Sequence, residues 1–488
     1  MGVVMQEEGK APKEKEQLKV RASKNKRLVY QITKVLIIEG LALAVLLMCI
    51  SMKRLADELQ SESNHGVQQV SAEEDVIESK EETPSKDPKD PVSQKEEAEL
   101  LAKQEREQYL LEANNMAASY DYEKAIEYIK AYKEDYNQYE ELLEAIVGYE
   151  KQKAECKNFG VYDSAMEVNH IFFHSLIYDT SKAFDNQYDS NGYNYYMTTV
   201  VEFKEMMRQM HEAGYVLVSI HDLVKKVKNE DGTYTYTEGE VMLPPDKKPF
   251  VLSQDDVNYY QYMKDDGFAT RVVIDQNGRP STEMRLEDGT TSVGDYDLIP
   301  VLETFIEEHP DFSYRGARGI IALTGYEGAL GYRTDPASKD LKTYDQDRET
   351  VTEIAKVMRE WGWEFANHSN GHRNMAECTQ EYFEYDTNQW LEHVGSLVGE
   401  TDLYVYPYGI DIQSGVGTYS NEKYLYLKKS GFSIFFGVEA KPWMQIKKNY
   451  VRMQRRPLDG QALLQYPDRL KDLFDIDKVI DVTRPALQ

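Results

Sequence analysis

The stretch IAKVMREWGWEFANHSNGH, residues 354–372, contains the pattern on which the fold depends. Its first half completes a helical pattern of apolar residues that spans residues 349–362. The apolar run at residues 363–369 follows at once and is expected to be a strand. His368 and His372 stand where this strand ends. The stretch therefore predicts a helix, then a strand, then polar side chains at the carboxyl end of that strand.

The same alternation of helices and strands extends over most of the chain after about residue 159. Further runs expected to be strands occupy residues 170–177, 215–220, 249–256, 270–274, 319–325, 403–409, 432–438 and 450–456. Helical patterns lie between many of them, at residues 202–214, 297–309 and 385–399. Such alternation predicts an α/β protein with a parallel sheet. The number of strands favours a (β/α) barrel of about seven strands, complete or distorted, over an open doubly wound sheet. The absence of G-x-G-x-x-G and Walker sequences disfavours nucleotide binding.

The overall charge narrows the classes of partner. The 488 residues carry 57 Lys or Arg and 85 Asp or Glu, a formal net charge of −28. Because binding to phosphate backbones needs basic surface, we expect no nucleic-acid partner. The three cysteines, Cys49, Cys156 and Cys378, are too few and too far apart for a disulfide framework or a cysteine metal site.

The N-terminal part has a different composition. Residues 1–34 contain nine Lys or Arg and four Glu, and the apolar run at 35–52 is just long enough to span a bilayer. Basic residues on its N-terminal side predict a single-pass anchor with a cytoplasmic N-terminus and an extracellular remainder. A buried amphipathic helix is the alternative.

The order of segments follows from these changes in composition. We expect a basic cytoplasmic tail at residues 1–34, a transmembrane helix at 35–52 and a disordered acidic linker at 53–98. A helical region at 99–157 resembles a single tetratricopeptide-like hairpin, and its alternative is a helical stalk that packs on the next domain. The catalytic domain is expected at 158–488.

Three polar clusters follow predicted strands. They are Asp255-Asp256, the pair His368 and His372, and the sequence YPYG at residues 406–409. In a barrel of parallel strands all three lie at the carboxyl end, where active sites are built. Judged alone, the Asp pair could equally cap a helix or form an Asx turn.

The residue types of the first two clusters indicate a metal site. His368 and His372 are four residues apart, so both imidazoles can face one ion. One Asp and two His leave an open fourth position, which is typical of catalytic zinc sites. Neighbouring side chains in extended structure point to opposite sides, so the second Asp is free to act as a base. Ser369 follows the first His where a metalloprotease helix needs Glu, which excludes that class.

These clusters resemble the polysaccharide deacetylase family, also called the NodB-homology or carbohydrate esterase family 4 domain. SQDDV at 253–257, HSNGH at 368–372 and YPYG at 406–409 are similar to three of its motifs, and the resemblance covers about residues 165–460. It implies that Asp255 is the catalytic base. It also implies that Asp256, His368 and His372 bind a divalent metal, Zn²⁺ before Co²⁺ or Ni²⁺, and that the Tyr408 N–H donates to an oxyanion.

The chain also departs from the family pattern. Val405 stands where the family has an Arg that pairs with the base, and no His follows His393, although the family's last motif supplies a general acid. From position we expect Arg456 to replace the missing guanidinium, with Arg452 and Arg455 of the same strand as alternatives. We expect His174 to replace the acid.

Aromatic residues near the clusters suggest a sugar-binding surface. We expect Tyr406, Pro407 and Tyr259 to contact substrate, with ordinary barrel packing as the alternative, because 36 tyrosines make local clusters common.

The leading hypothesis is a metal-dependent hydrolase that removes N-acetyl groups from a glycan containing N-acetylglucosamine, such as peptidoglycan or an exopolysaccharide. The alternatives are a deacylase of another ester or amide and a catalytically impaired homologue that binds glycan. An iron oxygenase with two His and one carboxylate has the same ligands, but the strand–helix alternation disfavours it.

Overall fold

The computed structural model describes residues 91–133, 135–159, 168–187, 189–413 and 415–487. The expected cytoplasmic tail, the expected anchor at 35–52 and nearly all of the expected linker lie outside these residues. Within the described ranges, no helix has the length and apolar character needed to cross a membrane.

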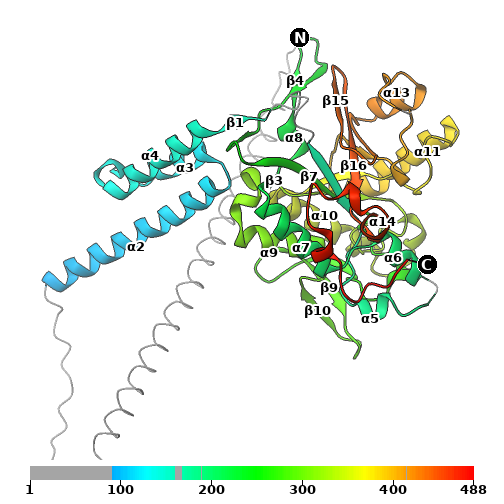
Figure 1. Ribbon diagram of the computed structural model, residues 1–488, viewed down its shortest axis with the longest axis horizontal. Coiled ribbons are helices and arrows are strands. Elements are labelled where there is room, and N and C mark those ends of the chain that lie inside the picture. Colours follow the sequence, from blue (N-terminus) through cyan, green and yellow to red (C-terminus); the bar gives the residue numbers. More distant parts are fainter. Residues whose placement is uncertain (1–90, 134, 160–167, 188, 414, 488) are drawn as a thin grey trace, which may run out of the picture. The chain divides into compact units, whose positions relative to one another are not determined.

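Seven parallel strands form a closed barrel, as the sequence predicts. In ring order they are β7 (Lys248–Asp255), β11 (Ile320–Leu323), β12 (Glu364–Asn367), β13 (Leu403–Val405), β14 (Ile434–Val438), β16 (Tyr450–Pro457) and β2 (Asn169–Phe173). Pairing of Ile320 with Ser253 joins β11 to β7, and pairing of Asn169 with Phe250 joins β2 to β7, so the ring closes. The strands form the centre of the molecule in Figure 1.

The strands are buried on both faces because helices cover the outside of the barrel. All five residues of β2 are buried, and seven of the eight residues of β7 are buried. This near-continuous burial is typical of parallel strands with a core on each side. It explains why the apolar runs of the sequence do not alternate with polar residues.

The covering helices begin and end at residues suited to those positions. Helix α7 (Val200–Glu212) starts with a capping box in which Thr199 and Glu202 each accept a backbone N–H of the other residue. Helix α10 (Tyr344–Trp361) ends at Gly362, whose φ of 101° lies in the left-handed region that glycine adopts readily. Other long helices are α9 (Leu298–Glu308), α11 (Gln380–Trp390) and α13 (Glu422–Lys429). Figure 1 shows α7, α9 and α10 beside the barrel strands.

Two predicted strands, at 215–220 and 270–274, are not part of the barrel. The run at 270–274 forms β8 (Arg271–Ile274), which pairs antiparallel with β9 (Pro280–Arg285), and β9 pairs with β10 (Thr291–Gly294). The connections between these strands are too short for a parallel crossover, which needs a dozen or more residues. The three strands therefore form a separate small sheet inserted between β7 and α9.

The remaining elements are short and lie around the barrel. Strand β3 (Tyr215–Leu217) pairs with β7 outside the ring, and β15 (Met444–Lys447) pairs antiparallel with β16. The others are β1 (Lys157–Asn158), β4 (Val224–Lys228), β5 (Tyr234–Glu238), β6 (Met242–Leu243), α5 (Thr180–Ala183), α6 (Ser190–Tyr196), α8 (Ile220–Leu223), α12 (Ser396–Val398), α14 (Gly460–Gln465) and α15 (Ile476–Val479).

Three helices precede the barrel, namely α2 (Pro91–Ala118), α3 (Tyr122–Lys130) and α4 (Glu140–Glu155). Helix α2 begins inside the segment expected to be linker. The Tyr120 hydroxyl donates to the Asp311 carbonyl (2.8 Å), and the Arg315 N–H donates to the Ser119 carbonyl (2.7 Å). Residues from Lys89 to Gln488 form one compact unit. The turn between α2 and α3 therefore packs on the barrel domain.

Candidate active site and metal centre

The three polar clusters meet at one end of the barrel. Asp255 is the last residue of β7 and Asp256 follows it. His368 follows β12, and Tyr406 follows β13. Because all seven strands are parallel, these residues emerge at the carboxyl end of the barrel, where the sequence predicts the site.

Asp256, His368 and His372 form a compact set of metal-binding atoms. One donor atom from each lies within 4.8 Å of the other two. The Nε2 atom of His372 is 3.8 Å from Oδ2 of Asp256, and the two imidazole rings are 5.0 Å apart. Two nitrogens and a carboxylate oxygen are ligands that zinc and related ions prefer. The donor set therefore fits a divalent metal.

The orientation of His368 is determined by its other ring nitrogen. Nδ1 lies 2.9 Å from the Val405 carbonyl oxygen, to which it can only donate. Nε2 is then the unprotonated nitrogen, which is the form that binds a metal. Val405 thus contributes its backbone to the site, although the family arginine is missing at this position.

The loop that carries the two histidines is held by a buried carboxylate on α11. Asp386 accepts the N–H of Asn370 at Oδ1 and the N–H of Gly371 at Oδ2, each at 2.8 Å. Burial raises the pKa of Asp386, and the two N–H groups oppose that rise. Asp386 could not be recognised from the sequence, because a helical pattern does not distinguish an aspartate that binds a neighbouring loop from one that faces solvent.

Four residues of the site have a strained backbone. Asp256, Ser369, His372 and Tyr408 have φ values between 46° and 60°, in the left-handed region that non-glycine residues seldom adopt. Such conformations cost about 1–3 kcal/mol each and are typical of functional sites. The strain turns successive side chains toward a common point.

Asp255 is buried beside the metal-binding atoms and is paired with Arg455. Its Oδ1 accepts a hydrogen bond from Nη1 of Arg455 (2.6 Å), and its Oδ2 is 3.8 Å from Nε2 of His368. Burial alone would raise the pKa of Asp255, but the charge of Arg455 and its hydrogen bond to Asp255 outweigh burial and lower it. Asp255 is therefore ionised.

Arg455, and not Arg456, replaces the arginine that the family has at position 405. Successive side chains of a strand point to opposite faces, so only one of two adjacent arginines on β16 can face the barrel interior. Arg456 faces away and binds Oδ2 of Asp472 (2.7 Å) and Oδ1 of Asn169 (2.5 Å). The prediction that Arg456 pairs with Asp255 is therefore wrong. The sequence places both arginines on the last strand but does not show which one points into the barrel.

Arg455 is itself positioned by residues that the sequence analysis did not single out. Its Nη1 donates to Oγ of Ser253 (3.1 Å), and Nε2 of His170 is 3.0 Å from the same oxygen. Its guanidinium carbon lies 4.2 Å from the centre of the Phe172 ring. These contacts are buried and fix the guanidinium against Asp255.

His174 follows β2 at the same end of the barrel. Its Nδ1 is 3.1 Å from the Tyr196 carbonyl oxygen, so Nδ1 donates and Nε2 is free of this contact. Its charge is among those that lower the pKa of Asp255. The structure thus places His174 near Asp255, and its role as the general acid stays a prediction.

Tyr408 is exposed and packs against His372, whereas the three residues predicted to contact substrate are buried. Its ring is 63% exposed and 4.7 Å from the ring of His372, and its hydroxyl donates to the His372 carbonyl (3.1 Å). The Tyr406 hydroxyl instead meets that of Tyr419, and the Tyr259 hydroxyl donates to Asp297 (2.7 Å). Tyr406, Tyr259 and Pro407 are buried. The prediction that these three residues contact substrate is therefore wrong, because their side chains are buried in the protein.

A neighbouring tyrosine supports the metal site and borders the surface. The Tyr260 hydroxyl donates to Oδ1 of Asp256 (2.9 Å) and also meets Oγ1 of Thr324 (2.9 Å). The rings of Tyr262 and Tyr326 lie 5.8 Å and 5.6 Å from the Tyr260 ring, and both are more than half exposed. These two exposed rings offer the aromatic surface that Tyr259 and Tyr406 do not.

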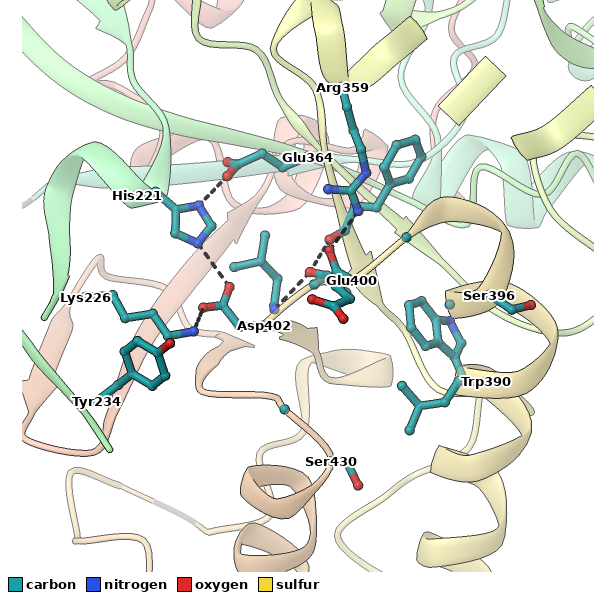
Figure 2. A pocket seen from close by; sticks show the side chains of 17 residues that line it. His221, Lys226, Tyr234, Arg359, Glu364, Trp390, Ser396, Glu400, Asp402 and Ser430 are labelled. Atoms are coloured by element: carbon teal, nitrogen blue, oxygen red, sulfur yellow. Dashed lines mark hydrogen bonds and ion pairs between the residues drawn. The ribbon is translucent and has the colours of Figure 1, made fainter. Parts of the chain in front are cut away.

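A large cavity of about 900 Å³ lies at the opposite end of the barrel, where β12 and β13 begin. Figure 2 shows His221 between the carboxylates of Glu364 and Asp402, with Lys226 on the same aspartate. Each of these charges already has a partner. Ion pairs at the amino end of barrel strands are typical of stabilisation and not of catalysis.

Comparisons with known proteins point to one family. Residues 338–433 match the family model for polysaccharide deacetylase, a segment that contains His368, His372 and Tyr408. No curated protein sequence gives a significant match.

The solved structures that are similar to this chain are distant. A de-N-acetylase from Aggregatibacter actinomycetemcomitans is 15% identical, with a TM-score of 0.35 over 63% of this chain and 99% of that one. BC0361, a polysaccharide deacetylase from Bacillus cereus, is 12% identical, with a TM-score of 0.32 over 64% and 69% of the two chains. The deacetylase PplD from Streptococcus pyogenes is 10% identical, with a TM-score of 0.32 over 61% and 96%.

Proposed function

Because the chain belongs to the polysaccharide deacetylase family, we propose that it is a metal-dependent hydrolase that removes N-acetyl groups from a polysaccharide containing N-acetylglucosamine. One observation carries the proposal: a carboxylate base, Asp255, stands beside three convergent metal-binding side chains. A protein that only bound sugars would have no use for this arrangement.

A divalent ion fits the site by its chemistry. Asp256, His368 and His372 would hold it, and Zn²⁺ suits two imidazoles and a carboxylate best, with Co²⁺ and Ni²⁺ as alternatives. When bound, such an ion lowers the pKa of a water molecule and polarises a carbonyl group.

The residues of the chain have separate roles in this proposal. Asp255 takes the proton of the water that attacks the acetamido carbon, and Arg455 holds Asp255 in place and ionised. The Tyr408 N–H donates a hydrogen bond to the carbonyl oxygen as negative charge develops on it. His174 gives a proton to the amide nitrogen as its bond to the acetyl carbon breaks. Acetate and a free amino sugar result.

The proposed location is the cell membrane, with the barrel outside the cell. The apolar run at residues 35–52 and the basic residues before it support this location. Peptidoglycan or an exopolysaccharide would be the polymer within reach of such an anchored enzyme.

A glycan-binding homologue without activity is the second candidate. Val405 and the absence of histidine after His393 favour it. Arg455 weighs against it, because a guanidinium is retained beside Asp255 from a different strand. A deacylase of another ester or amide would use the same residues, so substrate tests are needed to distinguish it.

The test is acetate release by the purified full-length chain, with N-acetylglucosamine oligomers and peptidoglycan as substrates and Zn²⁺ present. We expect acetate from the parent chain and none from Asp255→Asn, which has nearly the same shape and no base. Asp231→Asn, in the exposed turn between β4 and β5, is the matched control and should release acetate at the parent rate. If metal binds and no glycan yields acetate, the binding function would replace the proposed one.

A further inference from the structure

A second set of metal-binding side chains lies at the other end of the barrel. His211 is in the last turn of α7, His309 caps the carboxyl end of α9, and Asp311 is in the short 3-10 helix Pro310–Phe312. Each of these segments leads from a helix toward the start of a strand. The set is therefore at the amino end of the barrel, opposite Asp256, His368 and His372.

The three side chains have the same donor types as the proposed catalytic centre. One donor atom from each lies within 4.8 Å of the other two. Nε2 of His211 is 2.9 Å from Oδ1 and 3.0 Å from Oδ2 of Asp311, and the rings of His211 and His309 are 4.6 Å apart. Ligand atoms on one tetrahedral zinc ion are roughly 3.3 Å apart, since each is about 2 Å from the metal.

The surroundings of the set favour a cation. The carboxyl ends of α7 and α9 meet here, and each helix end has a partial charge of roughly −0.5 from its aligned peptide dipoles. Phe305 and Phe312 lie 6.0 Å and 5.9 Å from the ring of His211. These rings exclude water on one side, which strengthens the attraction between the helix ends and a cation.

The charges already present do not account for both histidines. Lys247 is 3.3 Å from Oδ2 of Asp311 and shares that carboxylate with His211. Asp311 therefore already has two partners, His211 and Lys247. Among the described residues, none forms a hydrogen bond with the imidazole of His309, which contacts the rings of His211 and Phe305. Its ring nitrogens are therefore available to an ion.

We propose that His211, His309 and Asp311 form a second divalent-metal site with zinc-type ligands. The ion would join the ends of α7 and α9 to the segment that receives the Tyr120 hydroxyl at the Asp311 carbonyl. It would thus stabilise the contact between the N-terminal helices and the barrel. All three side chains are partly exposed, so water completes the coordination. This inference does not depend on the proposed deacetylase activity.

The test separates the two sites by removing one at a time from the full-length chain. In His368→Ala/His372→Ala the catalytic centre is removed, and the second site should still bind one equivalent of Zn²⁺. Co²⁺ added to this variant should give the visible absorption of a nitrogen- and oxygen-bound ion. Adding His309→Ala should weaken Zn²⁺ binding at least about 100-fold. Removing a residue that only hydrogen-bonds to a metal ligand already lowers affinity about 10- to 100-fold, and removing a ligand itself should lower it more. His393→Ala, which removes a histidine remote from both sets, is the control.

The outcomes lead to distinct conclusions. Two equivalents of Zn²⁺ in the parent chain, one in the double variant, and a Tm of the double variant that rises with Zn²⁺ would support the second site. No bound Zn²⁺ and no cobalt absorption in the double variant would overturn it, and His211 and Asp311 would then be an ion pair. If His309→Ala does not fold, Asp311→Asn gives the same comparison with the shape of the side chain retained. Acetate release by His309→Ala should equal that of the parent, so failure here and failure of the proposed function are distinguishable.

Discussion

Replacing Arg455 with methionine removes the cation that compensates Asp255 inside the barrel. The side chains of Arg455 and Asp255 are 1% and 3% exposed, and their closest atoms are 2.6 Å apart. Breaking a buried ion pair by removing one partner costs about 3–5 kcal/mol, because the other charge is left without compensation. We therefore expect Arg455→Met to lower the free energy of unfolding by that amount.

Two further variants, Asp255→Asn and the double variant, show whether the loss of stability comes from the interaction between Arg455 and Asp255. Asp255→Asn alone leaves the guanidinium buried and unpaired, whereas Arg455→Met/Asp255→Asn leaves no charge to compensate. The double variant should be at least about 2 kcal/mol more stable than the sum of the single costs predicts. Arg456→Met is the matched control, since its partner Asp472 is half exposed and its loss should cost less.

The measurement is denaturant unfolding followed by tryptophan fluorescence. All four tryptophans, Trp361, Trp363, Trp390 and Trp443, belong to the barrel region, so the signal reports on it. Acetate release should fall in Arg455→Met and persist in Arg456→Met. Additive costs, within about 0.5 kcal/mol, would show that Arg455 and Asp255 do not stabilise each other and would refute the reasoning.

Three further predictions concern charge, metal affinity and metal removal. Burial would lower the pKa of His221, but its two carboxylate partners raise it to about 10. The stabilisation from this imidazolium is thus complete below the unfolded pKa of about 6.5 and is lost as pH rises through about 10. The Tm difference between the parent and His221→Ala should shrink over that range, and a constant difference would contradict it. Tyr260→Phe removes a hydroxyl from Asp256, so Zn²⁺ affinity should fall about 10- to 100-fold in a competition titration. Tyr262→Phe should leave that affinity unchanged. A chelator should abolish acetate release and added Zn²⁺ should restore it; full activity in the chelated protein would exclude a metal-dependent reaction.

Local sequence patterns were sufficient for the barrel and for the end at which its site lies. Residues 354–372 contain one helix, one strand and the two histidines in direct succession, and each depends mainly on its neighbours in sequence. Parallel strands then place every loop that follows a strand at one end, so Asp255 and His368 could be expected together without knowledge of a distance.

Local patterns did not distinguish residues by the direction they face. Arg455 and Arg456 are adjacent and chemically identical, and only the pairing of β16 with its neighbours determines which one enters the barrel. Tyr259 and Tyr260, in the loop after β7, also face different ways: the first binds Asp297 in the core, and the second supports Asp256. A shift by one residue reverses the facing of a side chain in extended structure, and one chain alone carries no signal for that choice.

The sequence by itself determined the order of helices and strands, the end of the barrel at which the site lies, and the aspartate and histidine residues that form it. Only the tertiary structure decided which arginine pairs with the base, which tyrosines face outward, and that His211, His309 and Asp311 meet. The physical reason is distance along the chain. Patterns of apolar residues reflect contacts between near neighbours, whereas the pair Arg455–Asp255 joins residues 200 positions apart. Such contacts exist only once the strands have closed into a ring.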